Sequence, residues 1–217
     1  MSTDPRGNWD ANAAVLTFTH PLDTSWLASL PITARVLDYG CGYGRTLAEL
    51  RDAGWRNTIG VDLSGEMIAR GRAKHPDLDL RHIDRMRLAE PDGAFDAALL
   101  FAVLTAILDE TEQDAVMAEL RRLVRPGGLL YLSDYPLQAG SRYAERYAAG
   151  LARFGVEGAW TREDGGVFRH HPRERLRTLT DGFSLIAERE IDATTMSGSP
   201  AVVVQMLGRR APTLDEG

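Results

Sequence analysis

The chain has 217 residues, of which 44% are hydrophobic, and its formal net charge at pH 7 is −6. We expect one domain over residues 1–217, because this length can bury a sizeable core. The acidic balance argues against nucleic acid as a partner, since surfaces that bind phosphate are usually basic. No apolar run approaches the ~20 residues that cross a bilayer, and the first residues lack the layout of a signal peptide. Cys41 is the only cysteine, so we expect no internal disulfide and a cytoplasmic location.

The first informative element is a predicted buried strand at residues 36–39 that runs into three glycines at alternate positions. Glycine lacks a Cβ and tolerates positive φ, so at Gly40, Gly42 and Gly44 the backbone can turn sharply and bring its polar groups against a ligand. The residues that follow carry apolar side chains at helical spacing, which predicts a strand, a glycine loop and a helix. A dinucleotide-binding fingerprint needs a glycine where this chain has Arg45. An ordinary tight turn is the alternative.

Two acids follow the next two predicted strands. Residues 58–61 form a short buried strand that ends on Asp62, and an apolar alternation over residues 78–83 is closed by Asp84. Ligands of open α/β sheets bind outside the carboxyl ends of the strands, so Asp62 should lie beside the glycine loop and accept hydrogen bonds from ribose hydroxyls. The alternatives are that Asp62 caps the next helix, although Ser64 is already a good cap, and that Asp84 is a solvated loop residue.

A fourth buried strand, a helix and a fifth strand come next. The fourth strand is predicted within residues 95–104. Residues 111–114 are a plausible capping box for the helix. That helix should stop at residues 125–128, Arg-Pro-Gly-Gly, because proline cannot continue the hydrogen-bond ladder. The fifth strand is predicted at residues 129–133.

The last third of the chain completes the fold. Residues 141–154 place aromatic side chains such as Tyr143 and Tyr147 on one stripe of a predicted helix. This helix would pack on the core or form a lid, and its aromatic side chains could instead line a pocket. Residues 183–195 and 201–207 predict two strands joined by a turn.

Together these motifs resemble those of the class I S-adenosylmethionine-dependent methyltransferases. The matching features are Asp38-x-Gly-x-Gly-x-Gly, the acids after the second and third strands, and Leu-x-x-Val-x-Pro-Gly-Gly before the fifth. The resemblance implies a doubly wound, seven-stranded, mostly parallel Rossmann-like α/β sheet that closes with a C-terminal antiparallel hairpin. It divides the single domain into an N-terminal cap segment (1–33), a cofactor-binding core (34–134), a substrate or lid region (135–182) and a closing hairpin (183–210).

The resemblance also implies S-adenosyl-L-methionine as the cofactor. The residues that it assigns, from the methionine end to the adenine, are Asp38, Gly40, Cys41, Gly42, Gly44, Phe101, Ala102, Asp62, Leu63, Met67, Asp84, Arg85 and Met86. In this set Asp62 holds the ribose, Asp84 takes the adenine amino group, and Ala102 lies under the sulfonium. Trp9 either closes over the cofactor or anchors a surface helix. Cys41 is interpreted as a small loop residue rather than a reactive thiol.

A general base is the hardest part of the site to assign from the sequence, because the chemistry needs one only when the acceptor arrives protonated. The sulfonium already activates its methyl group, so the transfer chiefly needs a nucleophile held in line. The candidate bases are His170 or its neighbour His171, Asp134, Tyr135 and His20. His170 is the first choice because a neutral imidazole can take a proton near pH 7, with a structural turn histidine as the alternative. Many relatives carry a histidine just after the fourth strand, which residues 104–107 lack. No metal site stands out.

These features predict methyl transfer to the oxygen or nitrogen of a small molecule, with specialised metabolism as a suggested setting. We expect a monomer or homodimer without nucleic-acid or membrane partners. Three alternatives stay open: an NAD-dependent oxidoreductase, which the displaced third glycine disfavours; an enzyme that uses the same cofactor for another reaction; and a non-catalytic binding protein.

Overall fold

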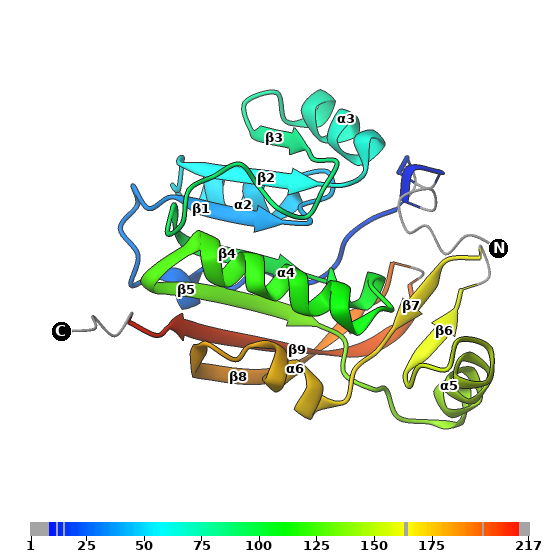
Figure 1. Cartoon of the computed structure of the whole chain (residues 1–217). Helices are drawn as coiled ribbons and strands as arrows, with labels where there is room; N and C mark the ends of the chain where they lie inside the picture. Colours follow the sequence, from blue (N-terminus) through cyan, green and yellow to red (C-terminus); the bar gives the residue numbers. More distant parts are fainter. Residues whose placement is uncertain (1–8, 12, 15, 163–164, 197, 213–217) are drawn as a thin grey trace.

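A computed structural model describes residues 9–212 except 12, 15, 163, 164 and 197, and its centre is one seven-stranded sheet (Figure 1). The strands lie in the order β3-β2-β1-β4-β5-β9-β8. Their bounds are β1 Val36–Tyr39, β2 Thr58–Asp62, β3 Asp79–His82, β4 Phe95–Phe101, β5 Val124–Asp134, β8 Phe183–Thr194 and β9 Pro200–Arg210. Strands β1 to β5 pair in parallel, whereas β9 is antiparallel to both β5 and β8. The predicted doubly wound sheet with a C-terminal hairpin is confirmed.

Helices connect the strands, and a small second sheet lies beside the main one. The helices are α2 Arg45–Asp52, α3 Gly65–Lys74, α4 Glu110–Leu123, α5 Ser141–Phe154 and α6 Arg173–Leu179, with short 3-10 turns η1 Thr24–Leu27 and η2 Leu104–Ala106. Strands β6 Ala159–Thr161 and β7 Val167–Arg169 pair antiparallel apart from the main sheet. Sequence analysis did not anticipate β6. Of the predicted N-terminal cap segment, residues 1–8, 12 and 15 lie outside the described part of the chain.

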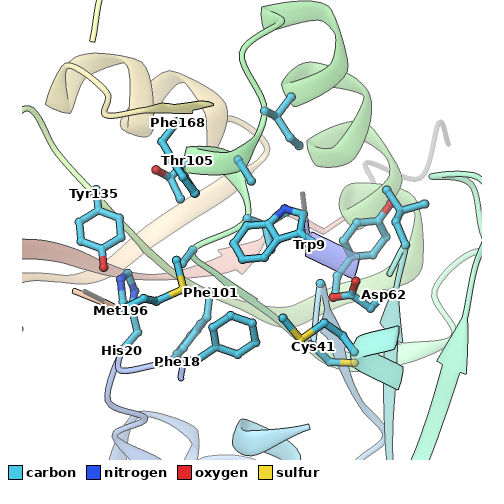
Figure 2. Close-up of a pocket in the computed structure, with 18 of the residues that line it drawn as sticks. Trp9, Phe18, His20, Cys41, Asp62, Phe101, Thr105, Tyr135, Phe168 and Met196 are labelled. Carbon is cyan, nitrogen blue, oxygen red and sulfur yellow. The ribbon is translucent and has the colours of Figure 1, made fainter. Parts of the chain in front are cut away.

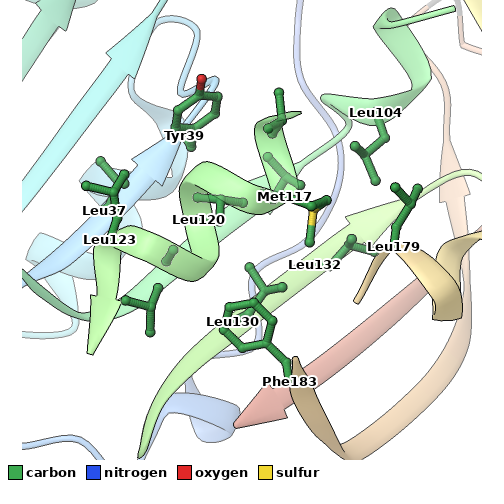
Figure 3. Packing of buried hydrophobic residues seen from close by; sticks show 14 of the residues in the cluster. Leu37, Tyr39, Leu104, Met117, Leu120, Leu123, Leu130, Leu132, Leu179 and Phe183 are labelled. Carbon is green, nitrogen blue, oxygen red and sulfur yellow. The ribbon is translucent and has the colours of Figure 1, made fainter. Parts of the chain in front are cut away.

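Both faces of the central strands are buried. On one face, Leu120 and Leu123 of α4 pack with strand residues such as Leu37 and Leu130 (Figure 3). On the other face, Leu50 of α2 belongs to a second cluster built on the alternate strand residues. Parallel strands covered on both sides must be apolar along their whole length, which explains the continuous apolar runs in the sequence.

The helices on the two faces position the functional crevice. Helix α2 leaves β1 toward one face of the sheet, and α4 follows β4 and covers the other. Because β1 and β4 are neighbours in the sheet, their connections diverge at this point. The carboxyl ends of these strands are therefore the switch point at which doubly wound sheets bind ligands.

The ends of α4 differ from the prediction. Its N-cap is Asp109, whose carboxylate accepts the N–H groups of Thr111 at 2.7 Å and Glu112 at 3.1 Å. Thr111 therefore lies inside the helix and is not the cap. The helix also ends before the Arg-Pro-Gly-Gly segment, and β5 begins at Val124. Residues 125–128 fall at a register shift between β4 and β5, a position where strands tolerate proline and glycine.

Candidate active site

A cavity of about 430 Å³ opens at the carboxyl ends of β1, β2 and β4 (Figure 2). Of the residues predicted for the site, those that line it are Trp9, Asp38, Gly40, Cys41, Asp62, Leu63, Met67, Met86, Phe101, Ala102, Tyr135 and His170. The predicted residues that do not line it are Gly42, Gly44, Asp84, Arg85 and Asp134. Figure 2 shows Asp62 and Cys41 at one end, Tyr135 and His20 at the other, and Trp9 and Phe18 between them.

The glycine loop needs its glycines for different reasons. Gly40, with φ of 79°, lines the cavity, and a Cβ there would collide with Val103. Gly42, with φ of 54°, lies against Phe18, with which a Cβ would collide. Gly44 is the N-cap of α2 in the left-handed conformation. Gly40 thus brings backbone to the cavity, while the other two shape the loop, a division that glycine spacing alone does not reveal.

Asp38 lines the cavity from β1, one residue before the end of the strand. It is fully buried, and the Thr46 hydroxyl donates a hydrogen bond to its Oδ2. Burial raises the pKa of Asp38 to about 7, against the opposing effects of the Thr46 hydroxyl and the Arg45 guanidinium. Near pH 7 this carboxyl therefore exchanges readily between charged and neutral forms, and a cationic ligand group beside it would favour the charged form.

Asp62 links the loops that follow β1 and β2. Its Oδ2 accepts the Gly42 N–H and its Oδ1 accepts the Ser64 N–H, both at 2.8 Å. The N-cap of helix α3 is Ser64, whose hydroxyl accepts the Met67 N–H at 3.1 Å. Burial raises the pKa of Asp62, and these two N–H bonds counteract the rise. Each carboxylate oxygen has two lone pairs, so Asp62 can hold the loops and still accept hydrogen bonds from a ligand in the cavity.

The loop after β3 differs from the prediction. The side chains of Asp84 and Arg85 are each 77% exposed, with Arg85 Nε 3.3 Å from Asp84 Oδ1. The cavity is lined instead by their neighbours Ile83 and Met86, together with Leu63 and Met67. This end of the cavity is therefore an apolar slot. Ile83 was missed as a site residue, although it is the last apolar residue of the segment 78–83 that predicted β3.

Aromatic side chains enclose the middle of the cavity. Trp9 makes edge contacts with Phe18 and Phe168, at centroid distances of 6.2 and 5.9 Å. Phe18 in turn stacks on Tyr43 of the glycine loop at 5.1 Å. Cys41 is buried in the wall, and burial raises the pKa of its thiol, so the thiol stays protonated. These contacts place the N-terminal segment against the loop, and they support the interpretation of Cys41 as a small wall residue.

Comparison with known proteins identifies the family. A model of the methyltransferase domain matches residues 36–128. Human methyltransferase-like protein 27 is 31% identical over 160 residues, covering 70% of this chain and 64% of that protein. The 27-O-demethylrifamycin SV methyltransferase of Amycolatopsis mediterranei is 33% identical, covering 60% of this chain and 50% of that one. The crystal structure of an S-adenosylmethionine-dependent methyltransferase from Methanosarcina mazei superposes with a TM-score of 0.82, at 22% identity, covering 88% of this chain and 99% of that one.

The chain belongs to the class I S-adenosylmethionine-dependent methyltransferases. It spans less than two thirds of the length of the two curated relatives named above. Ribosomal protein L11 methyltransferases are also among its relatives, so the family includes enzymes named for small molecules and for a protein.

The cavity fits the cofactor of this methyltransferase family. The absent side chain at Gly40 leaves room for close approach of a ligand to backbone. Asp38 offers a carboxylate to a cationic group, and Asp62 offers acceptors to hydroxyl groups. The apolar slot of Met67 and Met86 suits a flat base.

A strained residue forms part of the floor. Ala102, directly after β4, has a φ of 56°, which is unusual for a residue with a side chain and costs roughly 1–3 kcal/mol. Its N–H donates to the Ser133 carbonyl at 2.8 Å. Such strain is concentrated at functional sites, and here it shapes the turn after β4 that lines the cavity beside Phe101.

The other end of the cavity is rich in aromatic rings. His170 directly follows β7, stacks on Tyr135 at a centroid distance of 5.1 Å, and has its Nδ1 2.7 Å from the Tyr147 hydroxyl. Burial, with smaller contributions from His171 and Arg146, lowers the pKa of His170 to about 3. The ring is therefore neutral near pH 7. The structure places His170 and Tyr135 at the cavity, as sequence analysis expected.

Asp134 does not reach the cavity. Its carboxylate accepts the N–H groups of Tyr135 at 2.8 Å and of Thr105 at 3.3 Å. Burial raises its pKa to about 7. The expectation of a catalytic base at this position is therefore not supported by the geometry, because the carboxylate instead holds the turn η2, whose Thr105 lines the cavity.

Several lining residues escaped sequence analysis as site residues. They are Val103, Thr105, Ala106, Ile107, Glu112, Trp160, Phe168 and Met196, among others. Of these, only the aromatic residues carried a usable signal, because rings are enriched in ligand pockets. Within the described residues, no cluster of His, Cys, Asp and Glu side chains is arranged to hold a metal ion. No described helix has the length and apolar character that crossing a membrane requires.

Proposed function

We propose that the chain transfers the methyl group of S-adenosylmethionine to the oxygen or nitrogen of a small-molecule acceptor. The observation that carries this proposal is the continuity of one cavity, which joins the Asp38 and Asp62 end to the aromatic end at Tyr135 and His170. A cofactor held at the first end would present its reactive group toward the second.

The size and cover of the cavity favour a small acceptor over a polypeptide. Its volume of about 430 Å³ is near the lower end of the range of about 300–1,000 Å³ that is usual for small-ligand sites. Trp9 and Phe18 also cover the cavity from the N-terminal side. A ribosomal protein segment would need an open groove, whereas a compact metabolite fits beside the cofactor.

The residues of this chain would mainly bind, orient and exclude water. When bound, S-adenosylmethionine supplies a methyl group already activated by a sulfonium. Asp62 and the glycine loop would fix the nucleoside, and the floor at Phe101 and Ala102 would set the direction of approach. The apolar rings would keep water from competing with the acceptor, so that proximity and alignment supply most of the acceleration.

Two measurements test this proposal. Calorimetric titration with S-adenosylmethionine, S-adenosylhomocysteine and NAD should show binding of the first two in preference to the third. Incubation with a metabolite panel should produce S-adenosylhomocysteine together with a product heavier by one methyl group. Preferred binding of NAD would refute the cofactor assignment, and tight cofactor binding without any methylated product would refute the transfer.

A further inference from the structure

The aromatic end of the cavity holds a histidine with an unused ring nitrogen. His20 is 3% exposed, and its Nδ1 lies 3.0 Å from the Ser133 hydroxyl. Its Nε2 has no hydrogen-bond partner among the described residues. Leaving a buried polar atom unpaired costs free energy, so this nitrogen is a candidate contact for a ligand.

The surroundings of His20 place it beside the reaction centre. Its carbonyl accepts a hydrogen bond from the guanidinium of Arg45, the first residue of α2 after the glycine loop. Its ring is anchored on Ser133, whose carbonyl also accepts the Ala102 N–H at 2.8 Å. His20 is thus tied both to the start of α2, next to the glycine loop, and to the strained turn after β4.

The ring of His20 is neutral near pH 7. Burial, with the charge of Arg45, lowers the pKa of His20 to about 3, while the Ser133 backbone partly opposes this shift. The Ser133 hydroxyl, 3.0 Å from Nδ1, accepts when the ring hydrogen is on Nδ1 and donates when it is on Nε2. In the tautomer with the hydrogen on Nδ1, Nε2 presents a lone pair and can accept a hydrogen bond from a ligand.

The rings beside His20 form a continuous aromatic wall of stacked and edge contacts. His20 contacts Tyr135 at 4.6 Å between ring centroids, Tyr135 stacks on His170 at 5.1 Å, and His170 contacts Trp160 at 5.5 Å. All four residues line the cavity. Aromatic surfaces of this kind favour planar ligands, through stacked and edge contacts.

We propose that the acceptor is a planar hydroxyarene and that Nε2 of His20 accepts the hydrogen of its hydroxyl group. The inference rests on the proposed function. As the hydroxyl oxygen forms its bond to the methyl carbon, the carbon–sulfur bond breaks and its electron pair returns to sulfur. The hydroxyl proton passes to Nε2 and then to solvent. A deeply buried imidazole holds a proton weakly, so it suits an acidic phenol-type hydroxyl better than an alkyl alcohol.

The test compares two acceptors that differ in ionisation. At about pH 8.5 phenol is largely protonated, whereas 4-nitrophenol is largely ionised and needs no base. His20→Asn preserves a polar atom near Nδ1 and removes Nε2, and His20→Gln places an amide oxygen near the position of Nε2. His75→Asn is the matched control, because His75 lies at the C-cap of α3 and outside the cavity lining.

In His20→Asn we expect phenol turnover to fall about 100-fold and 4-nitrophenol turnover to fall less than about fivefold. Affinity for S-adenosylhomocysteine should not change. Binding of phenol to the protein saturated with S-adenosylhomocysteine, followed by tryptophan fluorescence, should weaken in His20→Asn and recover in His20→Gln. His75→Asn should match the wild type in every measurement.

Equal slowing of both acceptors, or no slowing of either, would overturn the role of His20. A wild-type protein that binds S-adenosylmethionine but methylates neither hydroxyarene would overturn the assigned acceptor class and leave the cofactor site intact. A wild-type protein that does not bind S-adenosylmethionine would overturn the proposed function as well.

Discussion

Replacing Asp62 with alanine tests the cofactor end of the cavity most directly. The carboxylate bonds the N–H groups of Gly42 and Ser64, each at 2.8 Å, and it lines the cavity. A hydrogen bond to a charged group contributes about 1.5–3 kcal/mol. Loss of the contact to the cofactor ribose should therefore weaken S-adenosylmethionine binding about 10- to 150-fold.

The same substitution should lower stability, because two backbone N–H groups lose their acceptor at a cost of about 1–3 kcal/mol each. Calorimetric titration should therefore be run well below the melting midpoint of the variant, determined by circular dichroism. Asp62→Asn retains one acceptor oxygen and should be intermediate in both measurements. Asp84→Ala is the matched control, because its exposed carboxyl lies outside the cavity lining, and its affinity should equal that of the wild type.

Wild-type affinity in a folded Asp62→Ala protein would refute the ribose assignment. An equal loss of affinity in Asp84→Ala would instead show that the loop after β3 contacts the cofactor. That result would agree with the sequence prediction for Asp84 and disagree with its exposed position in the structure.

Three further substitutions test other parts of the site. Gly42→Ala should lower the melting midpoint more than Gly155→Ala, since both positions have positive φ but only the first Cβ would collide with a neighbour, Phe18. Equal effects on the melting midpoint would show that the glycine loop or Phe18 shifts to accommodate the Cβ. Burial raises the pKa of Asp134 from 3.8 to about 7. The contribution of the protonated carboxyl to the free energy of unfolding is therefore complete below pH 3.8 and is lost as the pH rises through 7. Because asparagine cannot ionise, the melting midpoint of Asp134→Asn relative to the wild type should rise between about pH 5 and about pH 8. Turnover should change little. A large loss of turnover would show that Asp134 is a catalytic group. His170→Asn should raise KM for the acceptor and leave S-adenosylmethionine affinity unchanged, because His170 packs on Tyr135 in the acceptor wall; titration calorimetry and steady-state kinetics would reveal an unexpected cofactor role.

Much of the fold could be predicted because its signals are local. The buried strands are continuous apolar runs, the glycine loop is contiguous with β1, and the hairpin strands flank turn residues. The ends of α4 were less predictable, because Asp109 and Thr111 are both good N-caps and only the path of the incoming turn selects between them.

Three acids had the same sequence signal, a position at the end of a parallel strand, and the structure treats them differently. Asp62 faces the cavity, Asp84 is exposed, and Asp134 is bonded to the backbone of η2. Strand ends set which residues come near the crevice. The direction of each side chain depends on strand alternation and on the following loop, which local sequence does not specify.

By itself, then, the sequence determined the parallel core, the family and the neighbourhood of the cofactor, since those depend on residues close together along the chain. The acceptor end was decided only by tertiary structure. His20 meets Ser133 across 113 positions of sequence, and Tyr135, Trp160 and His170 meet through packing of β5, β6 and β7. Contacts over such separations arise from the closing of the sheet and leave no periodic pattern in the residues that make them.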